Sequence, residues 1–133
     1  MVDEVLSRMS LSEISVAIAK REVSSQEVVR NSLEELEKRG PSLNCLARLF
    51  SEQALAEAEL ADQELSSGNV RGPLHGVPLL HKDMFYRTGK ISACGSKICE
   101  NYVPDATATA LLKLDQAGAL DIGRLKMSSL LTD

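Results

Sequence analysis

The chain of 133 residues is long enough for one domain with a hydrophobic core. Hydrophobic residues make up 44% and charged residues 26% of the sequence, and the formal net charge is −4. An acidic chain disfavours nonspecific binding to phosphate backbones, and no apolar run approaches the ~18 residues of a membrane span.

Capping patterns predict the first two helices. Ser10 and Glu13 form a capping box, so we expect a helix to begin at Ser10. Ser24 and Glu27 form the same capping pattern at the start of a second helix, which the pair Gly40-Pro41 is expected to end.

A short strand near residues 45–50 and a third helix at about 52–65 follow. The apolar faces predicted for the three helices are Leu11, Ile14 and Ile18, then Val29, Leu33 and Leu36, then Ala54, Ala58, Ala61 and Leu65.

The second half of the chain alternates strands and helices. We expect a strand at Val77–Lys82, a long connection, a helix capped by Asp105 that ends at Gly118, and a last strand at residues 119–126. Alternation of this kind indicates an α/β fold rather than a helical bundle.

The segment Gly72–Asp83 carries the strongest signal for function. Val77, Leu79 and Leu80 indicate a buried strand, which Lys82 closes. Burial disfavours the ammonium form of a lysine, and the neutral amine is a proton acceptor. The alternative is a surface lysine at the end of an exposed strand, which is the usual place for lysine.

Neither a metal nor a cofactor is expected. The three cysteines, Cys45, Cys94 and Cys99, fit neither a disulfide framework nor a zinc site, and they indicate reduced thiols in the cytoplasm. His75 and His81 flank the predicted strand without enough further ligands for a metal, which favours a structural role.

Gly72–Asp83 closely resembles the catalytic-lysine motif of the amidase signature family, which hydrolyses or transfers amides with a Ser–cis-Ser–Lys triad. The resemblance extends from about Leu11 to Gly123. Its weaker parts are Ser24–Val29, Leu43–Cys45, Ala93–Ser96, Asp105–Thr107 and Leu114–Ala119.

The resemblance implies an amidase-signature fold with a mixed sheet covered by helices, of which this chain supplies only the N-terminal part. Residues 1–70 are expected to be helical for the most part, and residues 71–133 to hold the lysine strand and the α/β segment after it. Lys82 is then the catalytic lysine, while Gly76, Pro78 and Ser96 shape the substrate site.

The two serines of the triad have no match here. Ser128 and Ser129 lack a glycine-rich turn, and Cys94 lacks a neighbouring histidine, so none of them is predicted to be a nucleophile. The chain also departs from the family at Asp121, which stands where an apolar side chain is expected, and at Lys126.

The resemblance predicts an amidase that acts on a small amide substrate, although this chain alone is expected to be inactive. The alternatives are the amide-transferring component of a tRNA-dependent amidotransferase, which acts on misacylated tRNA, or a non-catalytic binding or structural fragment. The resemblance allows association with other subunits or with further copies of the chain, whereas direct contact with nucleic acid or a membrane is not expected.

Overall fold

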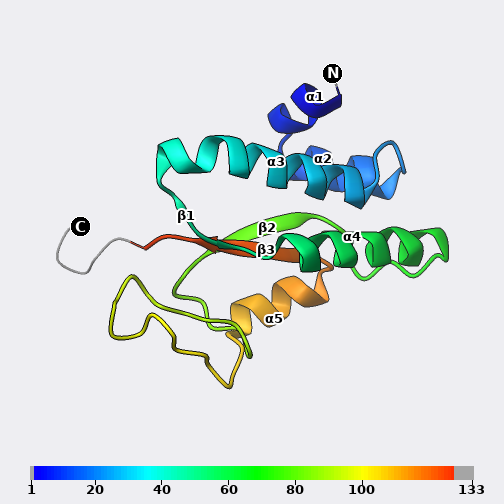
Figure 1. Ribbon diagram of the computed structural model, residues 1–133. Helices are drawn as coiled ribbons and strands as arrows, with labels where there is room; N and C mark the ends of the chain where they lie inside the picture. The colour runs from blue at the N-terminus through cyan, green and yellow to red at the C-terminus, as the bar shows by residue number, and fades with distance from the viewer. Residues whose placement is uncertain (1, 128–133) are drawn as a thin grey trace.

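The computed structural model describes residues 2–127, which form helices and strands in the alternating order of an α/β fold (Figure 1). The elements are α1 (Val2–Arg8), α2 (Leu11–Ala19), α3 (Ser25–Leu43), β1 (Leu46–Leu49), α4 (Ser51–Ser66), β2 (Pro78–Lys82), α5 (Thr109–Gln116) and β3 (Leu120–Leu125). None of the helices described is both long and apolar enough to cross a membrane.

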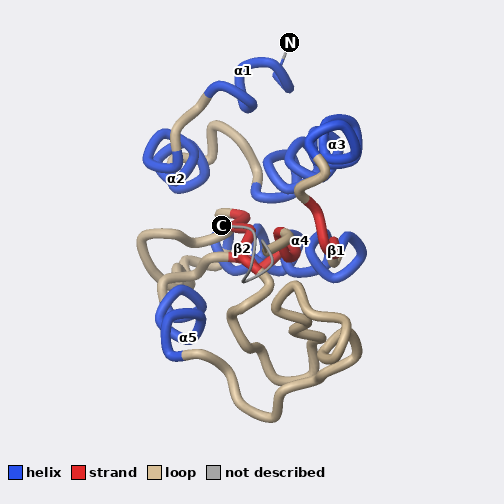
Figure 2. Tube along the Cα trace, turned by 90° about the vertical axis from the view of Figure 1, so that its left-hand side faces the viewer, coloured by secondary structure: helices blue, strands red, loops and turns tan. Residues whose placement is uncertain are grey.

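The three strands form one mixed sheet, as the resemblance implied. Their order is β1-β3-β2, with β1 antiparallel and β2 parallel to β3. Figures 1 and 2 show α1, α2 and α3 on one side of the sheet, and α5 with the long loop after β2 on the other. Helices therefore cover both faces, and β2 is an edge strand within the described residues.

Two apolar clusters join the helices to the sheet. The first is Leu6, Ala17, Ile18, Val23, Val28 and Val77, and the second is Val29, Leu33, Ala54, Ala58, Leu120 and Ile122. The first fastens α1, α2 and α3 to the residue before β2, and the second fastens α3 and α4 to β3. Each fully buried Val or Leu contributes about 1.5–3 kcal/mol, so these clusters fix where both strands lie.

The predicted capping box of α2 is confirmed. Ser10 Oγ accepts a bond from the Glu13 N–H at 3.1 Å, and Glu13 Oε1 accepts one from the Ser10 N–H at 3.0 Å. Within the predicted apolar face Ile18 is buried, but Leu11 is 48% exposed, so its assignment to the core was wrong. Ala17 takes its place in the first cluster.

The predicted end of the second helix at Gly40-Pro41 was wrong, because α3 continues through Pro41 to Leu43. Pro41 cannot donate a helical hydrogen bond, yet the helix continues for two more residues and ends where Asn44 turns into the left-handed region. Gly40 serves packing, since a Cβ there would lie 2.6 Å from Leu46 Cδ1.

Asp105 does not cap α5, so this prediction was also wrong. The helix begins at Thr109, and its N-cap residue Ala108 offers no side-chain bond. The Ala108 N–H donates to the Tyr86 carbonyl at 2.8 Å, and Thr107 Oγ1 accepts from the Thr88 N–H at 3.1 Å. These tertiary bonds hold Thr107 and Ala108 against the long loop, so the helix starts only after them.

Helix α1 was not predicted. Its seven residues carry no capping signal, and seven residues are too few for a stable isolated helix. It forms because Leu6 packs into the first cluster, which is a tertiary contact.

Candidate active site

Lys82 is the last residue of β2, where the sequence placed it, and it pairs in register with Leu125 of β3. Its side chain is exposed, and Leu79 and Leu80 are only half-buried, so the expectation of a buried lysine strand was wrong for this chain. The reason is topological: β2 has β3 on one side and is open along its other edge within residues 2–127.

The turn before β2 is tightly packed. Gly76 has φ +76°, and a Cβ there would lie 2.9 Å from Ser25 Oγ, so only glycine fits without strain. Ser25 Oγ donates to the Gly76 carbonyl at 2.6 Å, and the strand begins two residues later at Pro78. Gly76 and Pro78 thus fix the backbone that leads to Lys82, while their contact with a substrate stays a prediction.

Asp83, directly after Lys82, is buried and organises the loop that follows. Its N–H donates to the Leu125 carbonyl at 3.0 Å, and its Oδ2 accepts from the Ala93 N–H at 3.2 Å. Its carbonyl accepts from the Cys94 N–H at 3.0 Å and from Ser92 Oγ at 3.2 Å. Asp83 therefore brings the segment 92–94 beside the end of β2.

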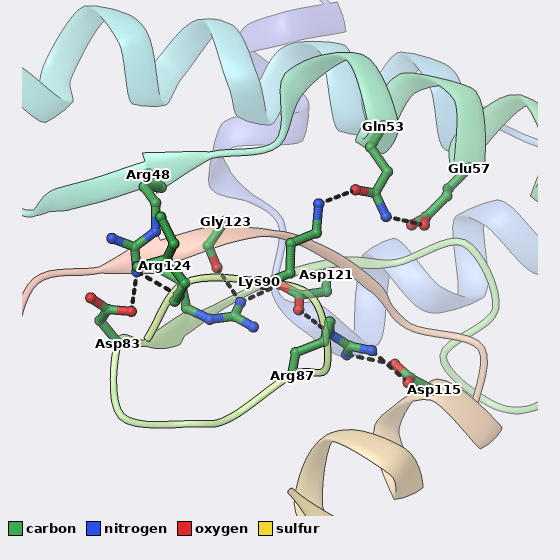
Figure 3. A network of polar contacts seen from close by, with 11 residues as sticks. Arg48, Gln53, Glu57, Asp83, Arg87, Lys90, Asp115, Asp121, Gly123 and Arg124 are labelled. Atoms are coloured by element: carbon green, nitrogen blue, oxygen red, sulfur yellow. Dashed lines mark hydrogen bonds and ion pairs between the residues drawn. The ribbon is translucent and has the colours of Figure 1, made fainter. Parts of the chain in front are cut away.

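Asp83 also forms an ion pair with an arginine of β1. Arg48 of β1 binds Asp83 Oδ1 through Nη2, which also donates to the Ile91 carbonyl at 2.9 Å (Figure 3). Sequence reasoning assigned no role to either residue. The available signal was Asp83 itself, the last residue of the motif, whereas Arg48 has no distinguishing pattern on a short strand.

Ser96, predicted to shape the substrate site, lies in the loop that Asp83 positions. Its Oγ accepts from the Ile98 N–H at 3.2 Å, and its N–H donates to the Ala93 carbonyl at 2.9 Å. No hydrogen bond within residues 2–127 joins Ser96 to Lys82. Ser128 and Ser129 lie outside the described residues.

A second charged cluster lies between β3, α5 and the long loop (Figure 3). Arg87 binds Asp115 through both terminal nitrogens at 2.9 Å and Asp121 through Nε at 2.7 Å. Arg124, which is fully buried, binds Asp121 Oδ1 at 2.6 Å. Asp121, which stands where the family pattern has an apolar side chain, therefore forms ion pairs with two arginines.

The ion pairs of this cluster shift the pKa values of Asp121 and Arg87. Burial by itself would raise the pKa of Asp121, but the bonds and charges of Arg124 and Arg87 outweigh it and lower that pKa. The hydrogen bonds that Arg87 donates to Asp115 are the largest cause of the raised pKa of Arg87. The pKa of His81 on β2 is lowered, chiefly by burial. At neutral pH Asp121 and Arg87 are therefore charged and His81 is neutral.

A cavity of about 310 Å³ adjoins this cluster, between α4 and the long loop. Lys90 reaches across it from the loop and donates to Gln53 Oε1 at 2.6 Å, and Gln53 Nε2 donates to Glu57 at 2.9 Å. Residues 2–127 contain no group of three or more His, Cys, Asp or Glu side chains placed to hold a metal ion.

Comparison with known proteins identifies relatives that match most of the chain. The family described as Amidase matches residues 27–133. The A-type subunit of glutamyl-tRNA(Gln) amidotransferase from Halorhodospira halophila (strain DSM 244 / SL1) is 40% identical over 118 residues, 89% of this chain and 24% of the relative. The protein of the same name from Pseudomonas aeruginosa PAO1 is 36% identical over 92% of this chain and 25% of the relative.

Solved structures agree on the fold. A structure described as fatty acid amide hydrolase matches 98% of this chain and 23% of its own with a TM-score of 0.91 and 26% identity. A crystal structure of an amidase matches 93% of this chain and 28% of its own with a TM-score of 0.83 and 33% identity. Native peptide amidase from Stenotrophomonas maltophilia matches 91% and 25% with a TM-score of 0.81 and 30% identity. The chain thus spans about a quarter of the length of the proteins it matches.

Proposed function

The chain belongs to the amidase signature family, and from this premise we propose that it is the N-terminal part of an enzyme that breaks carbon–nitrogen amide bonds in a small substrate. The observation that carries the proposal is the position of Lys82. It ends β2 within the segment that matches the family, and Asp83 holds the Ala93–Ser96 loop beside it.

We propose that Lys82 is the proton acceptor of a Ser–cis-Ser–Lys triad. Amide cleavage needs an activated nucleophile, a proton for the departing nitrogen and donors for the oxyanion. A neutral lysine would take the proton of the nucleophilic serine through a bridging serine. The exposed position of Lys82 in this chain means that further segments of a longer protein would have to cover the free edge of β2 and supply both serines.

A second candidate is the amide-transferring component of an amidotransferase. The relatives that bear the name of glutamyl-tRNA(Gln) amidotransferase reach 40% identity, so their chemistry is as well supported as simple hydrolysis. Such a protein would pass the amide nitrogen of its substrate on to glutamyl-tRNA(Gln) instead of releasing it into solution. Partner subunits would then be required, and a cytoplasmic setting fits the three free cysteines.

The test joins this chain to the remainder of the amidase with which it shares 33% identity, in place of the matching segment. Hydrolysis of small aliphatic and aryl amides is measured for the chimera, for Lys82→Ala and for the control Lys97→Ala, an exposed lysine of the loop. Lys82→Ala is expected to lower the rate by at least about 10²–10⁴-fold with the fold retained, while Lys97→Ala keeps it. Turnover near the parent level in Lys82→Ala would remove Lys82 from the mechanism.

The choice between hydrolysis and transfer is made on a protein that contains this chain together with its own following sequence. Ammonia release from glutamine and amidation of glutamyl-tRNA(Gln) are followed with and without added partner subunits. Amidation that depends on the partners supports the transfer reaction, whereas amide hydrolysis without them supports the amidase. Inactivity in both assays favours a non-catalytic fragment.

A further inference from the structure

His75 is a buried residue of the motif to which the reaction assigns no role. Its side chain lies against α4, with Nε2 at 2.8 Å from the Ala61 carbonyl, and the Arg71 N–H donates to Nδ1 at 3.1 Å. A carbonyl oxygen only accepts and an amide N–H only donates, so the ring must be neutral with its hydrogen on Nε2. Both ring nitrogens are thus committed to the backbone.

The turn that contains His75 is fastened to several elements at once. Ser15 of α2 donates to the Pro73 carbonyl, and Ser25 of α3 donates to the Gly76 carbonyl at 2.6 Å. The Leu74 and Gly76 N–H groups donate to the carbonyls of residues 117 and 118 in the α5–β3 turn, at 2.9 and 3.0 Å. His75 adds α4, which is the helix that packs on β3 through the second cluster.

We propose that His75 is a positioning residue that sets the start of β2 relative to α4, and through β2 the place of Lys82. Val77 follows His75 by two residues, is buried in the first cluster, and accepts the Leu120 N–H at 2.8 Å. From that bond β2 runs to Lys82 paired with β3, with one register shift in the pairing between Leu79 and Leu80. A displacement of the turn is therefore transmitted along the strand. Only the catalytic meaning of Lys82 rests on the proposed function.

The charges around His75 make its protonation state informative. Glu64 of α4 and Arg71 are ion-paired beside it, and Asp62 of α4 accepts the Ser25 and Gln26 N–H groups. The charges of Glu57 on α4 and Asp115 on α5 also act on Arg71. Protonation would turn Nδ1 from an acceptor into a donor that faces the Arg71 N–H, so the bond to Arg71 exists only with the neutral ring.

The first measurement uses the unaltered 133-residue chain. Long-range ¹H–¹⁵N NMR of the His75 ring at pH 7 should show a protonated Nε2 and a bare Nδ1. The Arg71 amide should also be protected from hydrogen exchange, because its N–H donates to that bare Nδ1. The opposite tautomer, or an Arg71 amide without exchange protection, would overturn the proposal. Neither result depends on amide turnover, so failure here is distinct from failure of the proposed function.

The second measurement compares His75→Ala with His75→Gln, whose amide nitrogen can still donate to the Ala61 carbonyl. The backbone amide resonances of Lys82 and Asp83 should shift in His75→Ala and return toward the unaltered chain in His75→Gln. Ser10→Ala is the control, because it removes a cap that is local to α2. Unshifted Lys82 and Asp83 amides in His75→Ala, or equal shifts in Ser10→Ala, would show that His75 only stabilises the fold.

Discussion

Asp121 shows how one residue that departs from the family pattern is accommodated. It lies on β3 between the buried residues Leu120 and Ile122, and its side chain is 9% exposed. A carboxylate at such a position requires compensating charge. Arg124 supplies it from the same strand and Arg87, which also binds Asp115, from the long loop, so the departure is tolerated within a four-residue charged cluster.

The first prediction removes this charge. Asp121→Asn leaves Arg124, fully buried, without its carboxylate, so we expect a loss of about 3–5 kcal/mol in the free energy of unfolding. The double variant Asp121→Leu with Arg124→Met replaces the pair by apolar side chains and should recover most of that loss. Urea titration of each variant measures the effect. A loss in the double variant as large as in Asp121→Asn would show that the pairing is not its cause.

The pH dependence of stability follows from the same carboxyl. The pKa of Asp121 in the folded chain lies below its ordinary value of 3.8, so its contribution is complete above that value and is lost as the pH falls through the lowered one. Unfolding free energies measured at neutral pH and in steps down to about pH 2 should therefore converge for the unaltered chain and Asp121→Asn. A gap that stays constant with pH would contradict this.

Gly76 and Gly68 form a matched pair for the turn before Lys82. Both have positive φ, +76° and +80°, but a Cβ at Gly68 meets nothing within 4 Å, whereas one at Gly76 meets Ser25 Oγ. Gly68→Ala should cost about 1–2 kcal/mol from backbone strain, and Gly76→Ala should cost about 1–3 kcal/mol more from overpacking. Thermal or urea unfolding compares them, and equal losses would show that Ser25 yields freely.

The position of Lys82 at the end of a strand was readable from sequence, but the surroundings of that residue were not. Lys82 at the end of a strand follows from the motif, because strand and turn signals are local. The partners of that site come from β1 and the long loop, with Arg48 bonded to Asp83 across a sequence separation of 35 residues. Exposure of Lys82 depends on which strand lies at the edge, and pairing order is a long-range property that periodicity does not contain.

The predictions of helix ends also succeeded in some places and failed in others. The capping box of α2 was predicted correctly because both of its bonds span three residues. The start of α5 was predicted three residues too early, because its position depends on the bond from Ala108 to the Tyr86 carbonyl. A local signal therefore predicted the start of α2, and a tertiary bond decided the start of α5. The end of α3 was missed for another reason: the left-handed residue Asn44, rather than Gly40-Pro41, ends that helix.

The uncapped start of α5 gives a stabilising prediction. Ala108 has extended backbone angles, φ −57° and ψ 139°, which suit a capping side chain that it lacks. Ala108→Ser should raise the free energy of unfolding by about 0.5–2 kcal/mol, because the hydroxyl can accept an N–H of the first turn. Ala110→Ser, inside the same turn and exposed, is the control and should lower it slightly. A loss in both variants would mean that Ala108 is not the effective cap.

The sheet as a whole leaves one edge of β2 unpaired among the described residues. The Val77 carbonyl accepts the Leu120 N–H and the Asp83 N–H donates to the Leu125 carbonyl, so the odd-numbered positions turn their backbone toward β3. By alternation, Leu80 and Lys82 turn an N–H outward, and Pro78 has none to offer. An unpaired N–H row of this kind is a template for another chain.

We therefore expect the purified 133-residue chain to self-associate through β2, with an elution volume in size exclusion that falls as concentration rises. Lys82→Pro removes an outward N–H and keeps the bonds to β3, so it should shift the chain toward monomer. Lys82→Ala is the control: it keeps that N–H and removes a charge that resists edge pairing, so it should associate at least as strongly. A single monomer peak for the unaltered chain at every concentration, with cooperative melting, would contradict this prediction. It would mean that the edge needs no partner, and it would favour the non-catalytic alternative over an enzyme whose lysine strand must be covered.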